Sequence, residues 1–293
     1  MCLLLPVGHA AWAEDAAIPV PAPIKDGHYR MVWHDEFSGK AGTPADAGRW
    51  VPWAPGKRRD AFNAEDAVRQ DGQGHLVITI RRAGNRIETG GVSTLGKFTA
   101  THGYFECRCR MQSQPGSWSA FWVTSDRIGQ TDKEGKPVGA AKAGAEIDVM
   151  EYLVHQPGLI HHTIHWDGYG KHHKSEHTGF KMPAVAEGFH TFAVRWDEKG
   201  YVFFTDGKES GRLKKPPVSN HPEHVILSCE VGEWGGDIAK AALPDAFTAD
   251  WVRVWQTPEQ EQADRARTAT EKADNERIAG RKTPEQGPRR PNP

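Results

Sequence analysis

The sequence has almost no net charge, no long apolar run and no sign of a nucleotide-binding loop. Its 37 Lys and Arg residues offset 38 Asp and Glu residues, so no partner held by bulk charge, such as nucleic acid or an anionic membrane, is expected. Apart from a short N-terminal stretch, no segment approaches the apolar length of a membrane-spanning helix. There is also no internal repeat, no Gly-rich phosphate loop and no alternation of strands with helices, so nothing indicates a parallel α/β fold.

Cysteine is scarce as well. The chain has four cysteines, and removal of a leader that contains Cys2 would leave three, an odd number that cannot all pair within one chain. Cys107 and Cys109 lie two apart on an expected strand, a geometry that does not suit a disulfide between them. The sequence leaves open a bond from one of them to Cys229 or three buried free thiols.

The two ends of the chain differ from its middle. Residues 1–13 (MCLLLPVGHAAWA) hold an apolar stretch and an A-x-A-like cleavage site without a basic n-region, so we expect a shortened signal peptide and a secreted or periplasmic protein. Residues 14–27 are rich in proline and predict an extended leader. Residues 257–293 are charged and nearly free of large apolar side chains, which predicts a disordered tail. The globular domain is therefore expected over residues 28–256.

Short alternating or apolar runs separated by Gly, Pro, Asp and Asn fill this middle part. No segment of helical length and helical periodicity lies between them. This pattern predicts an all-β sandwich. The runs include HLVITIRR (75–82), GYFECRCRM (103–111), SAFWVTS (119–125), HHTIHW (161–166), HTFAVRW (190–196), YVFFTDG (201–207), HVILSCEVG (224–232) and DWVRVWQ (250–256).

Three carboxylates crowd the stretch GAEIDVMEY (144–152). On a regular strand Glu146 and Asp148 share one face, but Glu151 comes one residue late and would face the other way. A β-bulge adds one residue to a strand and re-aims the side chains beyond it, and bulges are common beside active sites. An extra residue at Val149–Met150 would return Glu151 to the face of the other two acids.

Two interpretations fit such a row of acids. Like charges on one face raise one another's pKa, so the row is costly unless it is used or solvated. A solvated sheet face is the simpler interpretation. The functional one is a glycosidase, because retaining enzymes need one ionised and one protonated carboxyl group close together.

The stretch EIDVME (146–151) matches the E-x-D-x-x-E signature of glycoside hydrolase family 16, and the resemblance extends over nearly all of residues 29–256. Six further stretches resemble that family's strands in order: VWHDEFSG (32–39), GGVSTLGKFTATHGYFECRCRM (90–111), SWSAFWVTSD (117–126), HHTIHWDGYG (161–170), FHTFAVRWDEKGYVFFTDG (189–207) and ADWVRVWQ (249–256). The resemblance implies a concanavalin-like jelly roll of two curved antiparallel sheets with an open glycan cleft on the concave face. It also implies retaining endo-hydrolysis, with Glu146 as nucleophile, Glu151 as general acid/base and Asp148 as an auxiliary acid.

Sugar-binding residues are expected around these acids. Alternation puts Trp118, Ala120 and Trp122 on one face of their strand, and the resemblance implies that the two tryptophans line the cleft, with the small alanine leaving room for a sugar ring. His165 is expected to donate to a sugar hydroxyl or to the catalytic acids. Trp234 falls where the family often has a tryptophan near the cleft.

Cations, cofactors and assembly are less defined. Residues 167–177 (DGYGKHHKSEH) predict a loop whose basic side chains either rim the cleft for an anionic sugar or are merely solvated. Glu36 and Asp250 resemble ligands of a structural calcium ion found in some family members, although two acids alone do not define such a site. No cofactor is expected to be required, and a monomer is expected.

The resemblance leaves three functions open. An endo-β-1,3-glucanase of the laminarinase type is favoured because the bulged signature is typical of those members. A galactanase acting on agar-, porphyran- or carrageenan-type chains shares that signature, and basic residues inside the cleft would favour it. A non-catalytic glycan-binding lectin on the same fold is the third, and the presence of both terminal acids argues against it.

Overall fold

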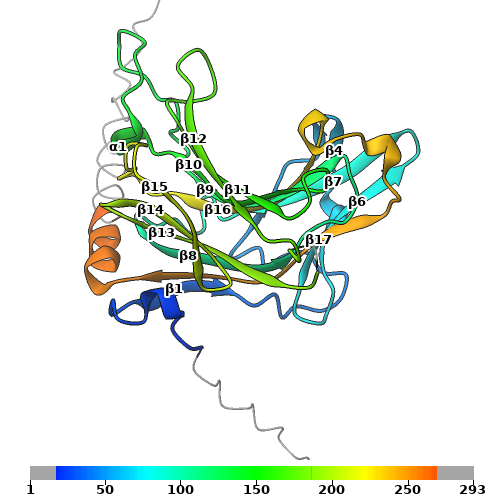
Figure 1. The fold of residues 1–293 in the computed structure, drawn as a ribbon, viewed down its shortest axis with the longest axis horizontal. Coiled ribbons are helices and arrows are strands. Elements are labelled where there is room, and N and C mark those ends of the chain that lie inside the picture. The colour runs from blue at the N-terminus through cyan, green and yellow to red at the C-terminus, as the bar shows by residue number, and fades with distance from the viewer. Residues whose placement is uncertain (1–17, 186, 269–293) are drawn as a thin grey trace, which may run out of the picture.

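Two stacked antiparallel sheets make up the protein, which is described here by a computed structural model over residues 18–185 and 187–268. In Figure 1 one layer carries β9 to β12 and β16, and the layer below it carries β1, β8, β13 and β14. The predicted all-β jelly-roll sandwich is confirmed, and each of the eight runs that predict strands corresponds to one.

The inner, concave sheet forms the floor of the cleft. Its strands are joined by antiparallel pairings: β9 to β12 neighbour one another in sequence order, and β16 lies between β9 and β7. Across the sheet they are β12 (Lys174–Lys181), β11 (Leu159–Trp166), β10 (Glu146–Leu153), β9 (Ser117–Thr124), β16 (His224–Val231), β7 (Arg86–Ser93) and β2 (Val51–Pro52).

The outer sheet backs the inner one, and the β6–β7 hairpin joins the two. Its strands run in the order β15 (Lys208–Leu213), β14 (Gly200–Thr205), β13 (His190–Asp197), β8 (Gly103–Arg110) and β17 (Asp245–Gln256). The long β17 also pairs with β1 (Arg30–Asp35) and β6 (Leu76–Ala83), and β5 (Val68–Gln70) pairs with β6. Short elements complete the described chain: β3 (Gly56–Arg58), β4 (Ala61–Asn63), α1 (Ala140–Ala143), and the 3-10 turns η1 (Ala22–Ile24), η2 (Glu65–Ala67), η3 (Glu233–Gly235) and η4 (Ile238–Lys240).

The core lies between the sheets and follows the period-two alternation of the strands. Phe121 and Ile147 of the inner sheet and Phe203 of the outer sheet are fully buried in it. The neighbours of Phe203, Val202 and Phe204, point the other way into a smaller apolar cluster. The inner sheet therefore buries one face in the core and leaves the alternate side chains for the cleft.

The chain before the sandwich is partly folded onto it. Ile24 in η1 is only 3% exposed and packs in the smaller cluster with Tyr104 and Trp255. The expectation of an extended leader over 14–27 is therefore wrong for this turn, because an apolar side chain finds a pocket on the outer sheet. The expected signal peptide at 1–13 lies outside the described residues.

The expected disorder of the tail is also wrong for its first part. Residues 258–268 form a helix. The Asp264 carboxylate accepts hydrogen bonds from the Thr101 backbone N–H at 2.8 Å and from the Gln256 side chain at 2.7 Å. Tertiary hydrogen bonds thus hold a segment that composition alone leaves unfolded, while residues 269–293 lie outside the described chain.

The cysteines and the basic loop are placed by the same two sheets. Cys107, Cys109 and Cys229 are all buried free thiols. The segment expected to be a loop up to residue 177 becomes strand β12 from Lys174 onward, because its backbone pairs with β11. Within the residues described, no helix is both long and apolar enough to cross a membrane.

Candidate active site

The predicted bulge is present in β10. On one side of this strand Glu146, Asp148 and Glu151 pair with Thr124, Trp122 and Ala120 of β9, and on the other side with His165, Thr163 and His161 of β11. Both partner series step by two residues, so all three acids share one face although Glu151 follows Asp148 by three. Val149 is the extra residue, because Met150 already pairs with Phe121. Val149 and Met150 are both fully buried in the core.

A buried histidine holds the bulge. His162 Nδ1 lies 2.6 Å from the Val149 carbonyl oxygen and donates to it, and His162 Nε2 lies 3.0 Å from Ser210 Oγ. The ring stacks on Phe203 with centroids 4.5 Å apart. Burial lowers the pKa of His162 to about 4, so the ring stays neutral at neutral pH. The carbonyl that the bulge removes from the β-ladder is therefore satisfied by a side chain.

We expect His162→Phe to lower both stability and activity. Phenylalanine preserves stacking on Phe203 but leaves the buried Val149 carbonyl without its donor, which costs about 1–3 kcal/mol of unfolding free energy. Denaturant unfolding measures this loss, and hydrolysis rates report the misaligned acids. Ser210→Ala is the matched control, since it removes only the Nε2 partner. A His162→Phe enzyme as active as wild type would contradict the bulge-holding role.

The three acids of β10 sit in a strongly desolvating environment. Burial raises the pKa of Glu151 well above its ordinary value, and the negative charges of Asp148 and Glu146 add to the effect. Burial and the neighbouring Glu146 charge likewise raise the pKa of Asp148. Burial also raises the pKa of Glu146, but the Tyr169 hydroxyl bond and the His165 charge oppose that shift. Glu146 is thus the acid with partners that favour its ionised form.

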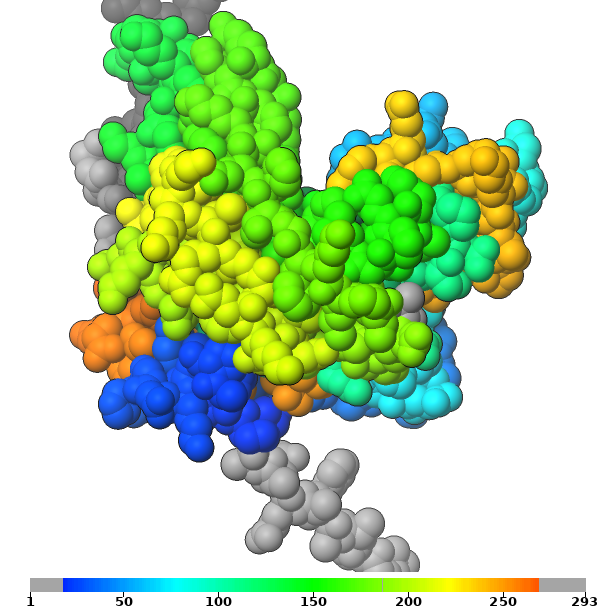
Figure 2. Space-filling view, in the orientation of Figure 1, coloured from blue at the N-terminus to red at the C-terminus, as the bar shows by residue number. Residues whose placement is uncertain are grey.

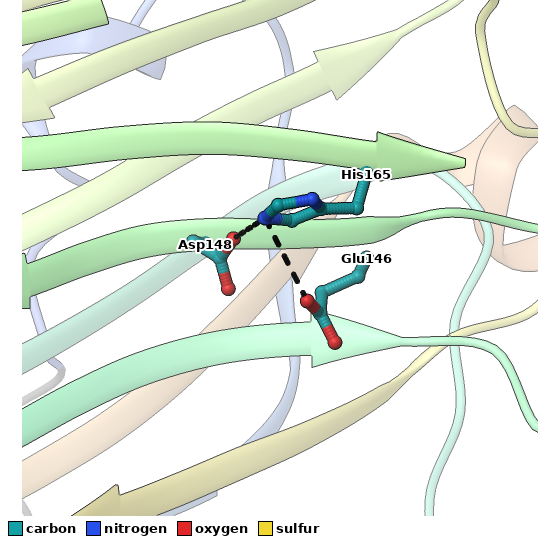
Figure 3. A group of neighbouring side chains, drawn as sticks. All are labelled: Glu146, Asp148 and His165. Atoms are coloured by element: carbon teal, nitrogen blue, oxygen red, sulfur yellow. Dashed lines mark ion pairs between the residues drawn. The ribbon is translucent and has the colours of Figure 1, made fainter. Parts of the chain in front are cut away.

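Those partners come from β11 and the turn after it. His165 Nε2 lies 3.2 Å from Asp148 Oδ2 and 3.9 Å from Glu146 Oε1, and the three side chains face one another in Figure 3. The Tyr169 hydroxyl donates to Glu146 Oε2. The His173 ring stacks on the His165 ring, and a 2.8 Å hydrogen bond joins His173 Nε2 to His165 Nδ1. Burial lowers the pKa of His165, and the neighbouring Glu146 charge opposes that shift.

The acids line an open cleft of about 840 Å³. Figure 2 shows the molecule hollowed between the segment after β11 and the segment that carries η3. All the side chains expected to bind sugar line this cleft. They are Trp118, Trp122, His165 and Trp234.

The three tryptophans differ in what they offer a ligand. Trp234 is 42% exposed. Trp122 is partly exposed and its Nε1–H donates to Ser228 Oγ at 3.1 Å. Trp118 is only 5% exposed, because the Arg59 guanidinium covers its ring at 5.1 Å and Trp234 packs edge-on against it at 5.3 Å. Trp122 and Trp234 are therefore the accessible platforms.

Several residues that line the cleft are not indicated by the sequence. Arg58 and Arg59 contribute two guanidinium groups that share the Glu230 carboxylate on β16, and Tyr169 caps Glu146. Ser228 and Glu230 lie two positions apart, and so on one face, of a largely apolar strand. This pair of polar residues is the feature of the sequence that could have indicated Glu230. The arginines lie more than 170 positions from Glu230, a pairing that no local pattern indicates.

The residues expected to hold calcium are engaged otherwise. Arg253 contacts both carboxylate oxygens of Glu36, at 2.9 and 2.7 Å, and Arg108 pairs with Asp250. A hard cation would have to displace these guanidinium groups. Within the described chain, the group of three or more side chains close enough to share a metal ion is Glu146, Asp148 and His165. Calcium at Glu36 and Asp250 stays an untested prediction.

An all-β sandwich with an open, tryptophan-lined cleft and a row of desolvated carboxyl groups across its floor defines a glycoside hydrolase that acts within a polysaccharide chain. The model of glycosyl hydrolases family 16 matches residues 56–253. The chain belongs to this family.

Individual relatives agree with the assignment. A beta-glucanase of Rhodothermus marinus is 28% identical over 258 residues, covering 79% of this chain and 87% of that protein. A keratan-sulfate endo-1,4-beta-galactosidase of Sphingobacterium multivorum is 27% identical over 251 residues, covering 78% of this chain but only 56% of that protein. Among solved structures, the laminarinase from Rhodothermus marinus superimposes with a TM-score of 0.66 at 26% identity, covering 78% of this chain and 98% of that one.

Proposed function

We propose that the protein is a retaining endo-glycosidase that cleaves β-1,3-glucan, with Glu146 as nucleophile and Glu151 as general acid/base. The observation that carries the proposal is the bulge at Val149, which turns Glu151 to the side of Glu146. The likeness to a beta-glucanase and to a laminarinase supports the glucan.

The proposed reaction has two steps. Glu151 gives its proton to the departing glycosidic oxygen while the Glu146 carboxylate attacks the anomeric carbon and forms a glycosyl-enzyme. Glu151, now ionised, takes a proton from water, which attacks the same carbon and releases Glu146. Two displacements restore the original anomeric configuration.

The electrostatics of the site suit this division of labour. Burial keeps Glu151 protonated beyond the pH range of an ordinary glutamate, as an acid catalyst requires. Tyr169 and His165 oppose the corresponding shift at Glu146. Asp148, whose pKa is raised, and His165, whose pKa is lowered, lie 3.2 Å apart beside the nucleophile.

We expect Tyr169→Phe to move the acidic limb of the pH profile of kcat/KM to higher pH. The hydroxyl bond lowers the pKa of Glu146, so its loss raises that pKa and protonates the nucleophile at a pH where the wild-type enzyme still works. The alkaline limb, set by Glu151, should not move. An unshifted acidic limb would show that Tyr169 does not tune Glu146.

The substrate is tested by a reducing-sugar assay on laminarin, lichenan, agarose, porphyran and κ-carrageenan. Under this proposal laminarin is cleaved fastest and internally, giving a ladder of oligosaccharides. A galactanase acting on agar-, porphyran- or carrageenan-type chains is the second candidate, favoured by Arg58 and Arg59 inside the cleft. Turnover of a galactan without turnover of laminarin would overturn the glucan assignment.

We further propose that the enzyme is exported, as the apolar residues 1–13 suggest, and that it works as a monomer. N-terminal sequencing of the mature protein tests the first point, and sedimentation tests the second.

A further inference from the structure

Two adjacent arginines project into the cleft around one buried carboxylate. Arg58 Nη2 lies 2.8 Å from Glu230 Oε1, and Arg59 Nε binds Glu230 Oε2. The Glu230 side chain is only 7% exposed. Two guanidinium groups thus share a single buried carboxylate at this end of the cleft.

Most of the donors on these arginines are free. A guanidinium carries five N–H groups, and Glu230 engages one nitrogen of each arginine. Among the residues that the structure describes, no other acceptor binds the guanidinium group of Arg58 or Arg59. Their side chains are 41% and 56% exposed, so the remaining N–H groups are open to a ligand.

Stacking fixes both side chains in place. The Arg58 guanidinium lies over the Trp53 ring at 4.2 Å, and that of Arg59 lies over Trp118 at 5.1 Å. A guanidinium held by a carboxylate and a ring has lost most of its rotamer freedom before a ligand arrives. Its planar fork matches the two oxygens of a sulfate or a carboxylate.

The pair lies within reach of the reacting carboxyls. Trp118, under Arg59, is opposite Glu230 on β16 and two positions along β9 from Ala120, the partner of Glu151. Two strand positions span roughly 7 Å. Because burial raises the pKa of Glu151 and Asp148, these acids repel an anion less than three ionised carboxylates would.

We propose that Arg58 and Arg59 form an anion subsite inside the cleft, which binds a sulfate ester or a carboxylate carried by the glycan near the cleaved linkage. This inference rests on the proposed endo-glycosidase function of the same cleft. It extends the substrate range from neutral glucans to acidic glycans. Contact with an anionic sugar, which the sequence led us to expect of the basic residues in 167–177, is thereby assigned to Arg58 and Arg59.

The test compares one backbone with and without the anion. Binding of laminarin, laminarin sulfate and carboxymethyl-β-1,3-glucan is measured by calorimetry in the Glu146→Ser background, where no hydrolysis is expected. We expect the anionic polymers to bind at least tenfold more tightly than laminarin, with a preference that weakens as salt is added. Arg58→Gln and Arg59→Gln should each lower affinity for the anionic polymers about tenfold to 100-fold and lower affinity for laminarin by much less, because only the anionic polymers lose a charged partner.

Controls separate a subsite from a structural ion pair. Each single variant leaves Glu230 with one guanidinium partner, and Arg212→Gln removes a similarly exposed, ion-paired arginine outside the cleft. Loss of affinity for all three polymers alike, or no preference for the anionic ones, would overturn the subsite. A response to only one derivative identifies sulfate or carboxylate as the group that is bound.

Hydrolysis by the wild-type enzyme distinguishes this inference from the proposed function. If laminarin is cleaved and the sulfate and carboxymethyl groups change neither binding nor the rate of cleavage, the proposed glucanase function is supported and the anion subsite is overturned. An arginine-dependent preference for the anionic polymers without cleavage of any β-1,3-glucan would keep the subsite and remove the proposed reaction on glucan.

Discussion

Glu146→Ser is expected to abolish hydrolysis while leaving glycan binding intact. Serine is too short to reach the position of the lost carboxylate and is not ionised, so no glycosyl-enzyme forms. Loss of a covalent nucleophile costs on the order of 10⁴- to 10⁶-fold in kcat. The cleft platforms, Trp122 and Trp234, are untouched by the change.

Reducing-sugar release measures the loss of turnover, and calorimetry with laminarin measures the retained affinity. Glu176→Ser is the matched control, because Glu176 lies on β12 between two cleft-lining residues and points away from the cleft. Its activity should equal that of wild type. Appreciable turnover by Glu146→Ser would remove Glu146 from the role of nucleophile.

The bulge is the part of the site that sequence predicts best. Strand periodicity is local, so a third acid arriving one residue late in EIDVME predicts an extra residue without any knowledge of neighbouring strands. The structure confirms that residue at Val149. The faces of SWSAFWVTSD and HHTIHW obey the same rule, because Trp118, Trp122 and His165 all line the cleft.

The features that sequence does not predict depend on contacts between distant segments. Alternation predicts only that His162 lies on the face opposite His165. It does not predict the acceptor of His162, which is a backbone carbonyl that the bulge frees. The positions of the Arg58 and Arg59 side chains depend on their ion pairs with Glu230, which only the folded chain brings close to them. The helix at 258–268 likewise depends on Asp264 meeting Thr101. Composition and spacing carry no information on such pairings.

The loop after β11 illustrates a partial success. The basic residues expected there either rim the cleft or are solvated, and His173 of the loop and His177 of β12 do line the cleft. The side chain that reaches the carboxyls, however, is Tyr169, which is 61% exposed although its hydroxyl binds Glu146. An exposed tyrosine in a charged loop has no sequence signature for this role.

Glu151→Gln is expected to lower hydrolysis of unactivated glycans about 10²- to 10⁴-fold, the usual contribution of a general acid. Glutamine keeps the size of the side chain and removes the proton that the leaving group needs. An aryl glycoside with an acidic phenol leaves without protonation, so its glycosyl-enzyme should still form and then accumulate, because no base activates water. A burst of phenol before slow turnover is the expected signature.

The same variant tests which glutamate plays which part. Burial raises the pKa of Glu151, and activity falls as pH rises through that pKa because the acid loses its proton. In Glu151→Gln the alkaline limb of the profile for the aryl burst should therefore disappear, while the acidic limb set by Glu146 stays. Glu233→Gln, an isosteric change at an exposed acid of η3, should alter neither limb. If the roles were reversed, Glu151→Gln would remove the nucleophile, and the burst would be lost together with the turnover.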